Sequence, residues 1–228
     1  MTRPWQSSLI NFKNSALNLF LKSNCPLCDR PAVDVFCKYC LRQLSESKLF
    51  DAARYWQGDL PLFAWGKYEG AVKRSIGKLK YDGHRAIGNL YGEWLAASWQ
   101  KSLPQTNLTR LVAMPIPLHP DKLTSRGFNQ AELIASSFSQ VTGAKLNLGL
   151  RRTRSTVAQF GLSKLARQEN VADAFEIDRS SVKSSDLVLL IDDIYTTGAT
   201  VRAAALALKA VDLHVYGVAV VATGRNDN

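Results

Sequence analysis

The sequence lacks the segments that would place it in a membrane or direct it to secretion. No stretch approaches the ~20 uninterrupted apolar residues that a membrane-spanning helix needs, so we expect no transmembrane segment. Polar residues interrupt every apolar run between residues 5 and 20, and this excludes the hydrophobic centre of a signal peptide. The sequence therefore predicts a cytoplasmic protein.

Glycine, proline and charge are all too scarce for a fibrous or disordered chain. The sequence has 228 residues, including 14 glycines and 8 prolines. Charged residues make up 21% of the sequence and hydrophobic residues 46%. This length allows one ordinary domain with an appendage, and it excludes a long repeat array. The composition predicts a globular protein with a packed core.

Positive charge is concentrated in the middle of the chain. Residues 61–170 hold 16 Lys and Arg against 6 Asp and Glu, whereas the rest of the chain holds 13 of each. Such a region favours a surface that attracts phosphate groups, either in nucleic acid or in a small anionic substrate. Solubility alone is the competing explanation, and charge does not choose between them.

The first 22 residues have the pattern of an amphipathic helix. Apolar side chains recur there at helical spacing: Trp5, Leu9, Phe12, Ala16 and Phe20. The pattern favours a helix that packs on its own protein over one that docks on a membrane or a partner.

No cysteine occurs outside a span of 16 residues. Two Cys-x-x-Cys pairs form this span, with eight residues between them: Cys25, Cys28, Cys37 and Cys40. Four thiolates at this spacing can converge tetrahedrally on Zn²⁺, which would stabilise a module over residues 23–60. Disulfides are the alternative, but the absence of a signal peptide argues for a reducing compartment. We therefore predict a structural zinc site.

From residue 61 onward, helical and strand patterns alternate. The expected helices are 88–100, 129–143 and 201–209, and the expected strands are 111–114, 146–150, 187–191 and 213–223. The apolar run 187–191 is typical of a strand buried on both faces of a parallel sheet. Between the expected strands 146–150 and 187–191, residues 151–170 form a polar segment that is typical of a long connection. Residues 61–228 are therefore predicted to form a doubly wound α/β domain.

A cluster of polar residues follows the apolar run 187–191. Asp192 and Asp193 come first, and residues 196–200 have the sequence Thr-Thr-Gly-Ala-Thr before a predicted helix. Ionised carboxylates accept hydrogen bonds, and the two hydroxyls of a ribose donate them. Backbone amides and hydroxyls at a helix N-terminus can surround a phosphate. Together these residues favour a ribose 5-phosphate site at the carboxyl end of the strand.

Residues 191–200 resemble the phosphoribosyl pyrophosphate signature of type I phosphoribosyltransferases. Further stretches resemble the ComF/GntX group, the competence-associated phosphoribosyltransferase-like proteins. The matching stretches are Cys25–Cys40, Leu79–Tyr81, Met114–Pro120, Arg126–Ala131, Thr153–Thr156 with Gln159, and Asn170–Phe175. The resemblance covers about residues 25–225, and it implies a type I phosphoribosyltransferase-like parallel sheet flanked by helices.

The resemblance also implies a role for each matching residue. Asp192 and Asp193 would hold the ribose hydroxyls and serve the catalytic step. Arg126, Lys164 and Arg167 are candidates for contacting the pyrophosphate or covering the site, and Mg²⁺ would accompany the pyrophosphate. The implied 5-phosphate loop consists of Thr196, Thr197, Gly198, Ala199 and Thr200.

Several functions are compatible with this resemblance. The chain would be a phosphoribosyltransferase that releases pyrophosphate, or a protein that senses phosphoribosyl pyrophosphate. Alternatively, it would be an accessory protein of the competence machinery that binds single-stranded DNA or a partner protein. The resemblance associates all of these with DNA uptake.

Two features depart from the family pattern. Residues 41–65 hold no second set of cysteines, so we expect a single zinc ion. No segment is recognisable as a binding site for an acceptor base.

Other side chains receive no firm role in the predicted site. Lys80 is only a possible site residue, the three histidines are assigned none, and four tryptophans are expected to pack in the core or under loops: Trp56, Trp65, Trp94 and Trp99.

Overall fold

The computed structural model describes residues 24–153 and 174–225. The predicted N-terminal helix over residues 1–22, the loop candidates Lys164 and Arg167, and most of the polar connection 151–170 lie outside these residues. Among the described residues, no helix is both long enough and apolar enough to cross a membrane.

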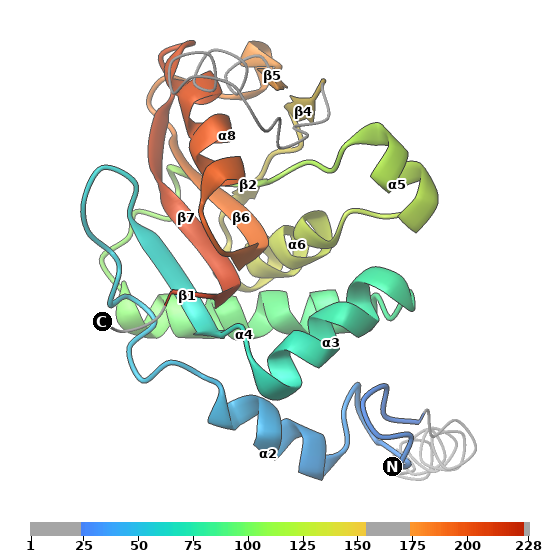
Figure 1. Ribbon diagram of the computed structural model, residues 1–228. Coiled ribbons are helices and arrows are strands. Elements are labelled where there is room, and N and C mark those ends of the chain that lie inside the picture. Colours follow the sequence, from blue (N-terminus) through green and yellow to red (C-terminus); the bar gives the residue numbers. More distant parts are fainter. Residues whose placement is uncertain (1–23, 154–173, 226–228) are drawn as a thin grey trace, which may run out of the picture.

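A five-stranded sheet forms the centre of the molecule (Figure 1). Its strands are all parallel and follow the order β1-β7-β6-β2-β3, so β6 is the middle strand. The strands are β1 (Leu62–Lys67), β2 (Leu111–Pro115), β3 (Lys145–Leu146), β6 (Leu187–Tyr195) and β7 (His214–Thr223). A separate antiparallel pair consists of β4 (Leu150–Arg152) and β5 (Phe175–Ile177).

Helices cover both faces of the sheet (Figure 1). α3, α4 and α6 contribute to one hydrophobic core, α8 packs in a second core on the opposite face, and α2 lies beside α3. The helices are α2 (Lys38–Glu46), α3 (Gly70–Tyr81), α4 (Ala86–Ser102), α5 (Pro120–Arg126), α6 (Gln130–Thr142) and α8 (Ala199–Lys209), with a short 3-10 turn η1 (Arg179–Ser181).

The middle strand contributes side chains to both cores. Leu189 and Ile191 belong to the core of α4 and α6, whereas Val188 and Leu190 belong to the core of α8. Successive side chains of a strand point to opposite faces, so a strand between two helical layers is apolar at every position. The run 187–191 has this property, and it places the carboxyl end of β6 between the two layers.

The predicted fold class is confirmed: a parallel sheet is flanked by helices, and four cysteines cluster near the N-terminus. The expected elements did not include α2, β1 or α3, and other local details also differ from the prediction. β6 continues through Asp192 and Asp193 to Tyr195. The single strand expected at 146–150 is replaced by two short strands, β3 and β4, in different sheets. The segment after β2, for which no helix was expected, contains α5; this helix begins at Pro120, and proline is well tolerated in the first turn of a helix.

Candidate functional site

A cavity of about 320 Å³ lies at the carboxyl ends of β6 and β2. Its polar lining includes the side chains of Lys80, Gln130, Arg152, Asp192, Asp193, Thr196 and Thr200. The loop after β2 closes another side through Ile116, Pro117 and Leu118. Segments that are distant in the sequence therefore meet at the strand ends, where open α/β sheets bind their ligands.

Asp193 is the most buried charged group in this cavity. Its side chain is 4% exposed, and Lys80 Nζ lies 2.6 Å from Oδ2. Gln130 donates a hydrogen bond of 3.1 Å from Nε2 to Oδ1. Among the described residues, Oδ2 meets no hydrogen-bond donor in good geometry, so the Lys80 ammonium is its main compensation. A buried carboxylate needs such a partner because it has lost its water.

Asp192 lies beside this pair and is half-buried. Its Oδ1 accepts a hydrogen bond of 2.8 Å from the Asp193 backbone amide. Loss of water around the carboxyl group and the nearby Asp193 carboxylate raise the pKa of Asp192 well above its usual value. Asp192 therefore sits in an environment that penalises its charge unless a ligand supplies donors or a cation.

A short chain of side chains connects Arg126 to the acid pair. Arg126 Nη1 donates to Gln130 Oε1 at 2.5 Å, and Gln130 in turn donates to Asp193. Asn129 accepts from the Ala131 amide and so caps the start of α6, which fixes the position of Gln130. Arg126 and Lys80 also line a neighbouring cavity of about 530 Å³. Arg126 therefore lies next to the acid-pair cavity and reaches it through Gln130.

The loop after β6 turns sharply into α8. Gly198 adopts a φ of +74°, which residues with a Cβ rarely adopt, and it occupies the position before the first helical residue, Ala199. A Cβ at this position would also collide with the Tyr195 side chain. Arg202 holds the loop by donating to the Thr197 carbonyl and to the Tyr195 hydroxyl. The backbone amides at the start of α8 are therefore held beside the cavity that Thr196 and Thr200 line.

The four cysteines converge at one point. Their sulfur atoms all lie within 4.8 Å of one another: Cys25, Cys28, Cys37 and Cys40. Cys28 Sγ and Cys37 Sγ are 3.4 Å apart, and three of the four residues are buried. A hydrogen bond from the Cys40 backbone lowers the pKa of the Cys37 thiol to about 6. This arrangement could hold a metal ion, because thiolates are the ligands that soft metals prefer.

The structure brings most of the sequence-predicted residues to one place. Asp192, Asp193, Thr196 and Thr200 line the same cavity, and Arg126 is adjacent to it. Thr197 is exposed on the loop, Gly198 is buried at the position before α8, and Ala199 is exposed as the first residue of α8.

Sequence reasoning missed two polar lining residues and undervalued a third. Gln130 belongs to the matching stretch Arg126–Ala131, and Arg152 comes just before the stretch that begins at Thr153. The family resemblance therefore pointed to the part of the sequence that holds each of them. Lys80, treated only as a possibility, forms the shortest charged contact of the site.

The fold and the two clusters define a class of protein: a parallel α/β sheet with an acid pair at the end of its middle strand and a cysteine quartet before the sheet. Competence protein ComFC of Bacillus subtilis is 27% identical over 186 residues, which cover 81% of this chain and 70% of that protein. Competence protein F of Haemophilus influenzae is 30% identical over 134 residues, covering 55% and 57% of the two chains. DNA utilization protein YhgH of Escherichia coli is 28% identical over 186 residues, covering 79% and 75%.

The chain is therefore similar to ComF competence proteins and their relatives, at 27–30% identity over 55–81% of its length. No protein-family model matches it. Among solved structures, the allosteric regulatory enzyme of purine biosynthesis aligns with a TM-score of 0.39 at 19% identity, covering 62% of this chain and 26% of that one.

Proposed function

We propose that the chain binds phosphoribosyl pyrophosphate with Mg²⁺ in the acid-pair cavity and acts in competence-related DNA uptake. The observation that carries the binding proposal is the juxtaposition of Asp192 and Asp193 with the loop 196–200 around one cavity of about 320 Å³. The names of the relatives, competence protein and DNA utilization protein, support the biological context.

The acid pair would hold the ribose. Two carboxylates accept hydrogen bonds, and the 2- and 3-hydroxyls of the sugar supply the donors. Asp193 is paired with Lys80 in the present structure, so the ammonium would shift toward the incoming pyrophosphate as the hydroxyls take its place. This exchange keeps every buried charge compensated, which a buried site requires.

The loop 196–200 would hold the 5-phosphate. Amides at the start of α8 and the hydroxyls of Thr196 and Thr200 border the cavity, and the helix dipole favours an anion there. Gly198 has no side chain, and its positive φ disfavours any residue that has one. The backbone of the loop can therefore lie close to the phosphate.

Cations would stabilise the leaving pyrophosphate. Arg126 and Lys80 meet in the adjoining cavity, and Lys164 and Arg167 are further candidates from the sequence. In a transfer reaction, the bond between C1 and the pyrophosphate oxygen breaks and its electron pair leaves with the pyrophosphate, while an acceptor attacks C1. The carboxylates would orient the sugar and favour positive charge on its ring.

Metal ions fit both clusters. Oxygen ligands are those that Mg²⁺ prefers, and the Asp192 carboxylate offers them in the cavity, where the ion would neutralise pyrophosphate charge. The cysteine quartet offers four thiolates, three of them buried, which suits structural Zn²⁺ and leaves no ligand position for water. We assign the zinc site a stabilising role only.

A second candidate function is binding of single-stranded DNA. The excess of Lys and Arg over residues 61–170 supports it, because such charge attracts phosphates. The two activities are compatible in one chain. Sensing of phosphoribosyl pyrophosphate without turnover is the alternative to transfer.

Calorimetry with phosphoribosyl pyrophosphate and Mg²⁺ tests the proposed pocket. Asp193→Asn should weaken binding about 10- to 150-fold, since hydrogen bonds to a charged acceptor contribute about 1.5–3 kcal/mol. Thr200→Val is a second variant on the phosphate side. Asp59→Asn, at an exposed acid away from the cavity, is the matched control and should bind as the wild type does. Wild-type binding that both cavity variants keep would refute the pocket.

A further inference from the structure

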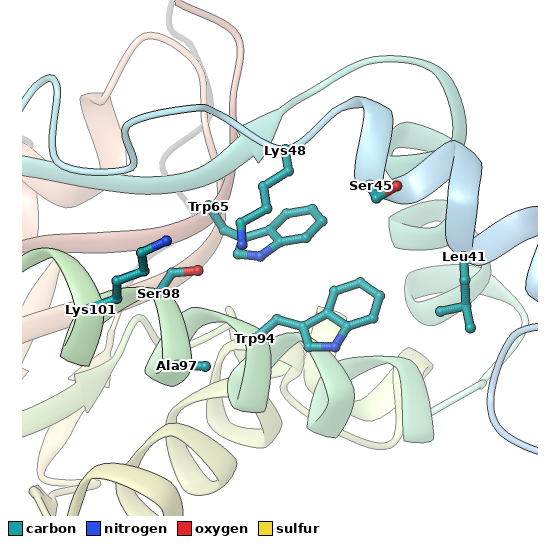
Figure 2. Close-up of a pocket in the computed structure, with 8 residues that line it drawn as sticks. All are labelled: Leu41, Ser45, Lys48, Trp65, Trp94, Ala97, Ser98 and Lys101. Carbon is teal, nitrogen blue, oxygen red and sulfur yellow. The ribbon is translucent and has the colours of Figure 1, made fainter.

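A third cavity lies between α2, β1 and α4, and it shares no lining residue with the acid-pair cavity. Its volume is about 380 Å³, within the range of small-molecule sites. Figure 2 shows its walls, which combine two indole rings with the ends of two lysine side chains. The proposed function of the acid pair uses none of these residues.

Two stacked tryptophans form the apolar side of this cavity. The rings of Trp65 and Trp94 lie 5.1 Å apart between centroids, with an interplanar angle of 20°. Trp65 is buried, but Trp94 is only half-buried and borders the cavity. Trp94 therefore packs in part, as the sequence predicted, and keeps surface that a further flat ring can contact.

Two exposed lysines form the polar side. In Figure 2, the ammonium ends of Lys48 and Lys101 point toward the Ser98 hydroxyl from either side. Neither lysine forms an ion pair with a described residue, and the described residues that line the cavity include no acid. Two ammonium groups and a hydroxyl offer donors and positive charge to one anion.

We propose that this cavity binds a nucleobase together with its phosphate. The base would lie against Trp94, and the phosphate would lie between Lys48, Lys101 and Ser98. An aromatic surface next to lysine ammonium groups matches the two parts of a nucleotide, because every base has a flat π face and every phosphate is anionic. A free nucleotide and a base within a single strand present the same chemistry.

Calorimetry of the full chain with dAMP and with a ten-residue oligodeoxyadenylate distinguishes these two sources. We expect dAMP to bind with a dissociation constant below about 1 mM. Comparable affinity for the two ligands would assign the site to a free nucleotide. Tighter binding of the oligonucleotide, falling steeply with salt, would assign it to single-stranded DNA.

Variants on both sides of the cavity test its assignment. Trp94→Leu should weaken dAMP binding about 5- to 150-fold, the range for loss of one base stack. The double variant Lys48→Gln with Lys101→Gln should weaken it as well.

The matched control for the lysine pair carries the same loss of charge elsewhere. This control is Lys183→Gln with Lys209→Gln, both exposed lysines, and it should bind dAMP as the wild type does. Because the lysine variants lie on the surface, they keep the test valid even if Trp94→Leu does not fold.

Asp193→Asn separates this site from the proposed phosphoribosyl pyrophosphate site. It should leave dAMP affinity unchanged, while Trp94→Leu should leave the affinity for phosphoribosyl pyrophosphate unchanged. The proposal would be overturned if neither dAMP nor the oligodeoxyadenylate binds the wild type, or if Trp94→Leu and the lysine variant both retain binding. Loss of dAMP binding in Asp193→Asn would likewise overturn it by moving the nucleotide to the acid-pair cavity.

Discussion

Replacing Lys80 by methionine would leave the buried Asp193 carboxylate without its charged partner. The two charged groups lie 2.6 Å apart, and their side chains are 19% and 4% exposed, so little water can replace the ammonium. Breaking a buried pair by removing one partner costs about 3–5 kcal/mol. Because Gln130 still donates to the carboxylate at 3.1 Å, we expect the lower end, about 3 kcal/mol, in the free energy of unfolding measured with urea.

Lys78→Met is the matched control for this prediction. Lys78 and Asp82 also lie 2.6 Å apart, but their side chains are 42% and 43% exposed. An exposed pair contributes about 0–1 kcal/mol, so this variant should be close to the wild type. Adding Asp193→Asn to Lys80→Met should recover most of the loss, since neither charge of the buried pair then remains. A loss in Lys80→Met no larger than that in Lys78→Met would mean that the Lys80–Asp193 pair does not stabilise the fold.

Three further predictions concern the acid pair, the cysteine quartet and the helix packing. Asp192→Asn should raise the free energy of unfolding by about 1 kcal/mol at pH 8 while weakening phosphoribosyl pyrophosphate binding. Because the raised pKa of Asp192 makes the folded wild type bind more protons than the unfolded chain, its stability falls as pH rises, and the advantage of the variant should vanish below about pH 4 in pH-dependent urea denaturation. Cys40→Ser should lower the zinc content found by metal analysis from about one ion per chain to near zero, and should lower the melting temperature; an unchanged zinc content would contradict the assigned ligands. Gly92→Ala should cost about 1–3 kcal/mol, because its Cβ would collide with the Ile134 carbonyl where α4 meets α6, whereas Gly77→Ala, in open space on α3, should be neutral or stabilising.

The sheet could be predicted where one strand carried apolar residues at every position. The run 187–191 is typical of a strand buried on both faces, and the helices around 88–100, 129–143 and 201–209 have apolar periodicity of their own. The end of β6 could not be predicted in this way. Asp192 and Asp193 have low strand propensity, yet they continue the ladder because β7 offers partners as far as Tyr195, which pairs with Thr223. Pairing across the sheet is not visible in a local pattern.

The candidate site could be predicted only in part for a similar reason. Paired acids before a threonine-rich loop are adjacent in sequence, so their proximity is local. Lys80 reaches Asp193 from the end of α3, and Gln130 reaches it from the start of α6, separations of 113 and 63 residues. Such contacts depend on how the helices pack on the sheet, and a single sequence gives no direct signal for them.

A crystal structure of the full chain with phosphoribosyl pyrophosphate and Mg²⁺ would show whether the acid-pair cavity binds this ligand. We expect the ribose hydroxyls against Asp192 and Asp193, the 5-phosphate on the amides of residues 198–200, and Lys80 moved from Asp193 toward the pyrophosphate. An empty acid-pair cavity at saturating ligand, or the ligand bound elsewhere with the Lys80 pair intact, would contradict this expectation.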